Sequence, residues 1–403
     1  MTPLKIAMLG PFGLHPNKTM RSRALRLAQA HVAQGHQVEI IMPPWQTPKE
    51  SGQVWTENGV NLRYVNVRGG LPAIVWRMLT AVRRFDPDVI HAFKPKAYSG
   101  LTMWCLWQLR RFSGGEGRPI LVTDTDDWEG AGGWNDRANY SAVQKRFFAW
   151  QEKWGMVHCD YLTVASRALQ TLAWGHGVAF DQVLYLPNGS GIERPPSEQT
   201  VDLRHTRRGE LGLGERPTIL LYSRLFEFEV GRLVKILRGV ADQVPDLAIL
   251  LVGAGLFEAD AADFKQILAE ADLLDQVLDT GWLDEDLLPA TLLAADVALY
   301  LMEDDLLNRT KCPVKLADLL HVGVPTVAEN VGQVGEYIVP NQTGLLRPSG
   351  DLQGIVADIV QFLDDQTVRD ELPTQAQNHI DTTFSWASHA KQLEAHYLTD
   401  FSA

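Results

Sequence analysis

Residues 308–338 read NRTKCPVKLADLLHVGVPTVAENVGQVGEYI, and this stretch decides the fold class. It opens with a polar, cationic loop and continues as an apolar pattern with helical spacing, which breaks at residues 323–325. A short β-prone run follows at 326–328, and a second turn at Gly332 leads into another helix start. Loop, helix, strand, loop and helix is the order in which an α/β sheet forms a ligand crevice at the carboxyl ends of its strands.

Two lysines of this stretch indicate an anionic ligand. Lys311 and Lys315 stand at the start of the predicted helix, where the helix dipole disfavours positive charge. Free backbone N–H groups at helix N-termini together with lysines suit an anion, and a diphosphate fits best. Asp318 lies one turn beyond Lys315 on the same helix face. Its carboxylate can accept hydrogen bonds from sugar hydroxyls, or it can pair with Lys315 on a solvated face.

Length and composition indicate an ordinary globular protein of two domains. The chain has 403 residues, 45% of them hydrophobic and 21% charged, and one domain usually takes roughly 100–200 residues. The three cysteines are too few and too scattered for a disulfide framework or a zinc site. The sequence shows no signal peptide, and no uncharged apolar run approaches the roughly 20 residues of a membrane span. We therefore expect a cytoplasmic protein.

The net charge of −12 is unevenly distributed. Residues 1–200 carry 22 Lys and Arg against 16 Asp and Glu, whereas the remainder carries 15 against 33. Ten of the 12 tryptophans lie in the basic half, and aromatic and basic residues mix in segments 98–112 and 140–154. On helices such segments suit a membrane interface, although they also fit core-facing aromatics with arginines that extend to solvent. The acidic composition and the lack of a recognition module argue against nucleic acid as a partner.

Strands and helices alternate along the chain. Strand, helix and strand within residues 4–42 predict a βαβ unit and therefore a parallel sheet. A second series of strands and helices begins at residue 218, after a stretch rich in Pro, Gly and charge at 187–217. The boundary between two α/β domains is therefore expected in that stretch.

Arg224 and His91 each follow or end a predicted strand. Arg224 comes just after the strand 218–222, where its guanidinium can grip a phosphate, or else pair with Glu227 or Glu229. His91 ends a strand inside the sheet, where it is either a buried, satisfied histidine or a group that contacts a substrate.

Three acids follow the predicted strand at 119–123, namely Asp124, Asp126 and Asp127. They can bind a metal, cap a helix and order a loop, or contact an acceptor hydroxyl. We expect hydroxyl contacts and no metal, because no second cluster of ligands accompanies them.

The chain resembles GT-B glycosyltransferases of family 4, mostly retaining enzymes that use nucleotide sugars. The resemblance covers nearly the whole chain, and its most specific part is the block at 313–346. The segments that carry it are GPFG at 10–13, QGHQV at 34–38, DPDVIHAF at 86–93, VASRAL at 164–169, PNG at 187–189, LLYSRL at 220–225, LLAADVALYL at 292–301, PVKLADLLHVGVPTVA at 313–328 and VGQVGEYIVPNQTGLL at 331–346.

The resemblance implies an α/β GT-B fold, with two Rossmann-like domains that face a cleft and a C-terminal helix that crosses back to the first domain. We place an N-terminal acceptor domain at 1–195, a linker at 196–216, a donor-nucleotide domain at 217–385 and the returning helix at 386–403.

The resemblance also implies roles for individual residues. Arg224 and Lys315 would neutralise the diphosphate leaving group, Asp318 would hold ribose hydroxyls, and His91 would contact the transferred sugar or the acceptor. The other donor-binding candidates are Gly13, Glu303, Asn308, Lys311, Gly332 and Gln333. The acceptor-binding candidates are His15, Asp126 and Asp127. No metal and no cofactor are expected, because fixed cations replace a metal.

The implied reaction moves a sugar from a nucleotide-diphosphate sugar to an acceptor hydroxyl, with retention. The acceptor is a glycan, a lipid-linked molecule or a small molecule. If it is a lipid, we expect peripheral contact with the inner face of the membrane.

Three positions depart from the family pattern. Thr310 stands where members carry the first of two donor-site glutamates, Glu229 replaces a lysine, and Phe93 replaces the second histidine after His91. Glu303 is one of the nearby acids that could substitute. These changes leave open a pseudoenzyme or binding subunit without transferase activity. A nucleotide-sugar epimerase is a weaker third alternative.

Overall fold

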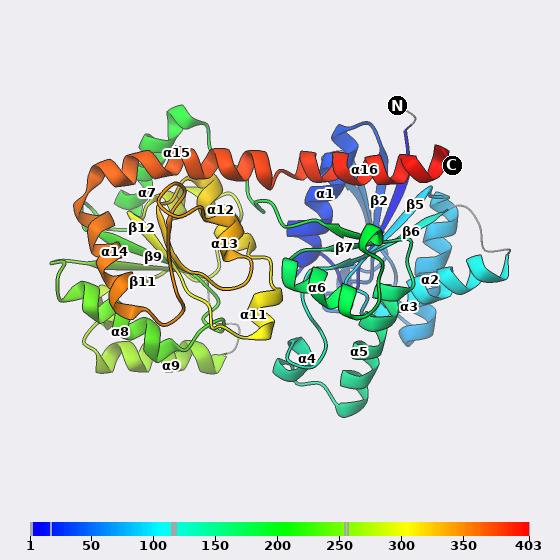
Figure 1. The fold of residues 1–403 in the computed structure, drawn as a ribbon, viewed down its shortest axis with the longest axis horizontal. Coiled ribbons are helices and arrows are strands. Elements are labelled where there is room, and N and C mark those ends of the chain that lie inside the picture. Colours follow the sequence, from blue (N-terminus) through cyan, green and yellow to red (C-terminus); the bar gives the residue numbers. More distant parts are fainter. Residues whose placement is uncertain (1–2, 17, 114–118, 254, 256–257, 403) are drawn as a thin grey trace. The chain divides into compact units, whose positions relative to one another are not determined.

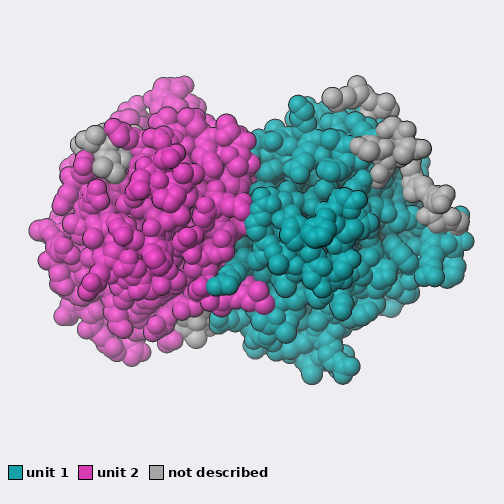
Figure 2. Space-filling view, viewed as in Figure 1, with its two compact units in different colours: residues 1–188, 309–312, 385–403 teal, residues 189–308, 313–384 magenta. Residues whose placement is uncertain are grey.

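The computed structural model of the chain describes residues 3–16, 18–113, 119–253, 255 and 258–402. The chain forms two compact units, coloured separately in Figure 2. Unit 1 comprises residues 1–188, 309–312 and 385–403, and unit 2 comprises residues 189–308 and 313–384. The chain therefore leaves unit 1 after Asn188, and two later segments return to it.

Unit 1 is built on an eight-stranded sheet with the order β3-β4-β2-β1-β5-β6-β7-β8. Every pair is parallel except β3 with β4. The central strands are buried along their whole length, as expected for a parallel sheet covered on both faces. The strands are β1 (Lys5–Leu9), β2 (Gln37–Met42), β3 (Val54–Glu57), β4 (Val60–Tyr64), β5 (Val89–Phe93), β6 (Ile120–Thr125), β7 (Tyr161–Val164) and β8 (Val183–Tyr185).

Helices cover both faces of this sheet (Figure 1). The helical segments are η1 (Met20–Leu25), α1 (Arg26–Ala33), η2 (Pro48–Glu50), α2 (Gly70–Phe85), α3 (Ala97–Phe112), α4 (Trp134–Arg137), α5 (Ala142–Val157), α6 (Arg167–Gly175), η3 (Phe180–Gln182) and α16 (Trp386–Ser402). The last helix, α16, packs on α1, and its Leu393 and Tyr397 are fully buried in the same core as Leu27. The prediction that the C-terminal helix returns to the first domain is therefore confirmed.

Unit 2 contains a six-stranded, wholly parallel sheet with the order β11-β10-β9-β12-β13-β14. Its third-second-first-fourth-fifth-sixth arrangement is the Rossmann order, and unit 1 repeats it with β4, β2, β1, β5, β6 and β7. The strands are β9 (Thr218–Tyr222), β10 (Ala248–Val252), β11 (Val277–Asp279), β12 (Val297–Tyr300), β13 (Thr326–Glu329) and β14 (Leu345–Arg347). The predicted α/β class with two Rossmann-like domains is confirmed.

The helical segments of unit 2 include the stretch that decided the fold. Residues 308–338 form α12, then β13, then α13, and Gly323 ends α12 in the left-handed conformation at φ 86°. The segments are η4 (Ser197–Gln199), α7 (Thr200–Glu210), α8 (Val230–Ala241), α9 (Glu258–Glu270), η5 (Leu274–Gln276), α10 (Leu288–Leu293), α11 (Leu306–Thr310, whose last two residues belong to unit 1), α12 (Val314–Val322), α13 (Val334–Tyr337), α14 (Leu352–Asp364) and α15 (Gln366–Thr383).

Residues 196–216, expected as a linker, form η4 and α7 within unit 2. Arg204 donates hydrogen bonds to the carbonyls of Leu293 and Ala295 at the end of α10, and Arg208 donates to Ala294 O at 2.6 Å. Cationic side chains on the last carbonyls of a helix are favourable, because these carbonyls lack partners within the helix.

No described helix is long and apolar enough to cross a lipid bilayer.

Candidate active site

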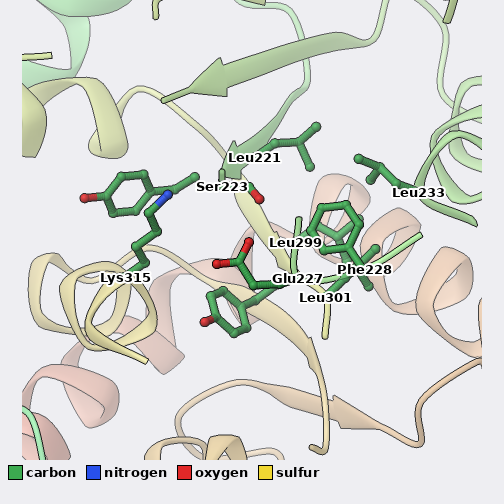
Figure 3. A pocket seen from close by; sticks show the side chains of 10 residues that line it. Leu221, Ser223, Glu227, Phe228, Leu233, Leu299, Leu301 and Lys315 are labelled. Atoms are coloured by element: carbon green, nitrogen blue, oxygen red, sulfur yellow. The ribbon is translucent and has the colours of Figure 1, made fainter. Parts of the chain in front are cut away.

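Arg224 and Lys315 lie where the strand order of unit 2 reverses, between β9 and β12. In open α/β sheets, ligands bind outside the carboxyl ends of the strands at this point. A small pocket lies there, and Figure 3 shows Lys315 on one side of it, opposite Phe228 and Leu233. Its lining residues are Leu221, Tyr222, Ser223, Glu227, Phe228, Leu233, Leu299, Tyr300, Leu301 and Lys315.

Arg224 is positioned by a sharp turn directly after β9. Leu225 adopts φ 59°, and its N–H donates to Ser223 Oγ at 2.9 Å. Arg224 Nη2 donates to Glu227 Oε1 at 3.2 Å, and the guanidinium lies 4.7 Å from the centre of the Phe226 ring. Its Nε is buried without a hydrogen-bond partner among the described residues. The guanidinium is thus held in place and still has donor capacity.

Lys315 occupies the first turn of α12 and reaches the ends of β9 and β10. Its Nζ lies 4.7 Å from the centre of the Tyr222 ring and 5.8 Å from that of Trp282. Gly253 ends β10 at φ 110°, and a Cβ there would lie 2.5 Å from Ser223 O and 3.8 Å from Lys315 Nζ. Glycine is therefore required here by the positive φ and by the close approach of the Ser223 carbonyl, and Lys315 Nζ lies beside this turn.

The Asp318 side chain forms hydrogen bonds within unit 2. Its Oδ1 accepts hydrogen bonds from Ser190 Oγ at 3.0 Å and Gly191 N at 2.7 Å, and its side chain is largely buried. The hydroxyl of Tyr222 lies 3.5 Å from Oδ2. Burial raises the pKa of Tyr222 well above its usual value, and Asp318 raises it further. The carboxylate thus orders the chain at 190–191 and is hydrogen-bonded on both oxygens.

Asn308 connects the loops that follow β9 and β12. Its Nδ2 donates to Glu227 O at 2.9 Å and to Glu303 O at 3.0 Å. The Glu303 carboxylate is half exposed and lies 3.2 Å from Arg232, which also pairs with the fully buried Glu329. Asn308 therefore fixes the loops around the site, while the Glu303 side chain remains accessible.

Gly332 and Gln333 form the loop between β13 and α13. Gly332 adopts φ 53°, and the buried Gln333 directly precedes the helix. β13 pairs with β12, so this loop leaves the same edge of the sheet as Lys315.

Lys311 lies in the returning segment 309–312 and therefore belongs to unit 1, whereas Asn308 and Lys315 on either side of it belong to unit 2. Its Nζ lies 5.4 Å from the centre of the Trp134 ring, and the neighbouring Thr310 O accepts a hydrogen bond from Ser166 Oγ at 2.7 Å. The structure therefore does not bring Lys311 and Lys315 together within one unit.

His91 lies inside the unit 1 sheet and not at its edge. The side chain is completely buried, and its Nε2 lies 3.1 Å from Thr163 Oγ1 and 3.9 Å from Asp124 Oδ2. Burial lowers the pKa of His91 to about 4, although Asp124 opposes this shift. The expected contact of His91 with a sugar or an acceptor does not fit this position, because no atom of the ring reaches a surface.

Asp126 and Asp127 follow β6 at the carboxyl edge of the unit 1 sheet, beside the end of β5. Lys94, directly after β5, lies 3.3 Å from Asp126 Oδ1 and 2.7 Å from Asp127 Oδ2. Burial, partly offset by Lys94, raises the pKa of Asp126 to about 7. Burial alone would lower the pKa of Lys94, but the surrounding carboxylates raise it above its usual value. The arrangement is a compact, charged group at a strand end.

Gly13 and His15 lie in the loop after β1. Gly13 packs under Tyr64, whose hydroxyl would be 2.9 Å from an added Cβ and accepts a hydrogen bond from Leu14 N at 2.8 Å. His15 is exposed. Within the described ranges, no three His, Cys, Asp or Glu side chains are grouped for metal binding.

Comparison with known proteins identifies the family. Residues 18–189 match the family described as Glycosyl transferase 4-like domain, and residues 204–379 match Glycosyl transferases group 1. The chain is a GT-B glycosyltransferase of family 4 (group 1). This confirms the resemblance found in the sequence.

One relative and two solved structures illustrate the similarity over nearly the whole length of this glycosyltransferase. The phosphatidyl-myo-inositol mannosyltransferase of Mycobacterium leprae (strain TN) is 23% identical over 407 residues, covering 98% of this chain and 97% of that protein. The sucrose-phosphate synthase of Thermosynechococcus elongatus superposes with a TM-score of 0.70 and 19% identity, covering 99% of this chain and 100% of that one. HepE of Anabaena, solved with UDP-glucose, superposes with a TM-score of 0.71 and 16% identity, covering 98% of this chain and 100% of that one.

Two residues beside the candidate positions, one in each unit, were not expected from the sequence. Trp282 is half exposed beside Lys315, directly after Gly281 in the loop that follows β11. Lys94 neutralises the acids at 126–127. A signal existed for Trp282, because only one other tryptophan follows residue 200. No sequence signal pointed to Lys94, because its partners are more than 30 residues away in sequence.

Proposed function

We propose that this glycosyltransferase moves a sugar from a nucleotide-diphosphate sugar, bound by unit 2, to an acceptor hydroxyl, with retention as in most of its family. The observation that carries the proposal is the position of Arg224 and Lys315, both at the carboxyl end of β9 where the strand order reverses. Two fixed cations at this place suit the diphosphate of a sugar donor.

Charge stabilisation is the proposed chemical contribution of unit 2. When the bond between sugar and diphosphate breaks, negative charge grows on the leaving phosphate. Arg224, anchored by Glu227, and Lys315, held over Tyr222, meet this charge without reorganisation. They would supply the positive charge that a bound divalent cation supplies elsewhere, so no metal is required.

The remaining donor contacts follow from the surroundings of Lys315. Trp282 offers an exposed ring on which the nucleotide base can stack, and aromatic faces accept any base. Asp318 holds the loop at 190–191 through Oδ1 and accepts from the Tyr222 hydroxyl through Oδ2, and the second acceptor position of a carboxylate oxygen suits a ribose hydroxyl. Gly332 and Gln333 provide loop backbone at the same sheet edge.

The acceptor is assigned to unit 1. Asp126, Asp127 and Lys94 present a carboxylate-rich strand end that can accept hydrogen bonds from the hydroxyls of a glycan, a lipid-linked sugar or a small molecule. His91 has no part in the proposed mechanism because it is enclosed in the sheet.

A panel of UDP, GDP, ADP and their sugar conjugates tests the proposal through thermal shift, followed by transfer assays with the nucleotide that binds. A ligand at 100 times its dissociation constant stabilises the folded state by about 2.7 kcal/mol, which is readily seen. We expect one nucleotide to stand out and its sugar conjugate to release the nucleoside diphosphate when an acceptor is added. A chain that binds none of them would have no donor site.

The second candidate is a pseudoenzyme, favoured by the loss of charge at Thr310. Threonine has no carboxylate, and the Thr310 side chain is fully buried while its carbonyl accepts a hydrogen bond from Ser166, so this residue offers no charge to a donor. Nucleotide binding without transfer to any acceptor, and without slow hydrolysis of the donor, would support this alternative.

A further inference from the structure

One face of helix α5 alternates apolar and basic side chains. Val143, Arg146, Trp150, Lys153 and Val157 are spaced by three and four residues, so they line one side of the helix. Val143 is 77% exposed, Trp150 44% and Val157 39%, and Arg146 and Lys153 are also exposed. A helix face of this kind is not part of the protein core.

Aromatic contacts extend this face onto α3, which packs beside α5. The centres of the Trp150 and Trp154 rings are 6.4 Å apart. The Trp154 ring in turn lies edge-on to Trp107 of α3, with 5.9 Å between the ring centres. Arg111 lies 5.6 Å from the Trp107 ring, and Trp104, one turn earlier, is 36% exposed. The surface, called here the α3/α5 face, is defined by Trp104, Arg111, Arg146, Trp150, Lys153 and Trp154.

The charge of this face has one sign. The sequences of α3 and α5 contain a single carboxylate, Glu152, which is almost fully buried and accepts a hydrogen bond from Glu129 N at 2.9 Å. Among the described residues, Arg111, Arg146 and Lys153 form no ion pair, and the Arg111 guanidinium lies over the Trp107 ring. Arg110 of α3 pairs with Asp160, but in a chain of net charge −12 the α3/α5 face presents Arg111, Arg146 and Lys153 without counter-charges among the described residues.

We propose that the α3/α5 face docks on the surface of an anionic lipid bilayer. Tryptophan rings prefer the headgroup layer, where the apolar body and the polar N–H are both satisfied. Lysine and arginine between them meet lipid phosphates and extend their aliphatic stems along the apolar surface. Tryptophan and arginine also occur in protein interfaces, but positive charge without carboxylates among the tryptophans favours a uniformly anionic surface such as a bilayer with acidic headgroups.

Vesicle flotation tests the docking with full-length protein and two lipid compositions, pure phosphatidylcholine and phosphatidylcholine with phosphatidylglycerol. We expect binding to the anionic vesicles only, weakened by salt. Each Lys or Arg near an anionic surface strengthens binding by about fivefold, so R146E/K153E should lose at least about 20-fold. The matched control is K235E/K391E, which changes the same charge at two exposed lysines outside the face.

Trp104→Ser with Trp150→Ser tests the apolar part, and Trp76→Ser, at an exposed tryptophan of α2, is its control. The melting temperature of each variant shows whether it is folded. Loss of vesicle binding in the folded double variant, but not in the control, supports the proposal. Wild-type protein that does not float with anionic vesicles overturns it, as does equal binding by R146E/K153E. A dimer in light scattering that the Trp104/Trp150 variant abolishes, without vesicle binding, would assign the face to a second copy of the chain. Nucleotide binding is measured on the same samples, so failure of the docking and failure of the donor site are distinguished.

Discussion

Arg23 donates two hydrogen bonds to Asp124, from Nε to Oδ1 at 2.9 Å and from Nη2 to Oδ2 at 2.6 Å, and both side chains are buried. The third donor, Nη1, bonds to Asn188 Oδ1 at 2.8 Å. Asn188 in turn donates from N to Cys312 Sγ and from Nδ2 to Cys312 O, both at 3.0 Å. One arginine therefore links η1, β6, the end of the first segment of unit 1 and the returning segment 309–312.

Arg23→Leu should destabilise the protein by about 3–5 kcal/mol, because it leaves the Asp124 carboxylate buried without its cation. Denaturant unfolding measures this loss. R23L/D124L should lose less than R23L alone, since no uncompensated charge remains. A loss below about 1 kcal/mol in R23L would show that the pair is not a structural link.

Lys315→Ala should lower kcat by about 100-fold, because removal of one group that stabilises transition-state charge typically costs this much. The donor KM should change less, because the diphosphate keeps Arg224. Steady-state transfer rates check this, with Lys235→Ala, an exposed lysine of α8, as the control. Near-normal turnover in K315A would remove Lys315 from the mechanism.

The strands and most of the larger helices were predictable from sequence because their patterns are local. The strand expected at 218–222 is β9, and the helical pattern that breaks at residues 323–325 is α12, which ends at Val322. The positions of Arg224 and Lys315 were also predictable, since one follows a strand and the other begins a helix, and parallel strands place these positions at one edge of the sheet.

The remaining features depend on contacts between distant residues. His91 was ambiguous because strand periodicity does not tell which groups close over a side chain, here Thr163 and Asp124. The helix α7 was missed because its arginines, which read as a charged linker, bond to α10 almost 90 residues later. Lys311 was grouped with Lys315 by spacing, but the chain between them passes from one unit to the other.

Trp282→Ala should weaken nucleoside diphosphate binding by about tenfold, because stacking of one base on an aromatic side chain contributes roughly 1–3 kcal/mol. Trp282→Phe should keep most of the affinity. Isothermal calorimetry with the nucleoside diphosphate measures both, and inorganic pyrophosphate, which has no base, should bind all three proteins alike. Equal loss for pyrophosphate would mean that the substitution disturbs Lys315 instead.

His31 makes unit 1 sensitive to acid. Its side chain is completely buried beside α16, and the centre of its ring lies 5.7 Å from that of His36 and 6.2 Å from that of Tyr397. Neither nitrogen of the His31 ring has a hydrogen-bond partner among the described residues. Burial above all, with smaller effects of His36 and His91, lowers the pKa of His31 to about 3. The folded protein therefore keeps this ring neutral in the range where the unfolded chain protonates it.

The unfolded state takes up this proton below pH 6.5, its ordinary pKa, whereas the folded state does so only near pH 3. Stability that is present above pH 6.5 is therefore lost as the pH falls, by up to about 1.4 kcal/mol per pH unit for this one proton. His31→Leu removes the difference, so its stability relative to wild type should rise steadily from pH 7.5 to pH 5. Urea unfolding at pH 7.5, 6 and 5 measures the change, and His15→Leu, at an exposed histidine of the same unit, is the control. If H31L and wild type lost stability in parallel, the buried ring would be taking up its proton in the folded state, and the enclosure by α1 and α16 would have to open at mildly acidic pH.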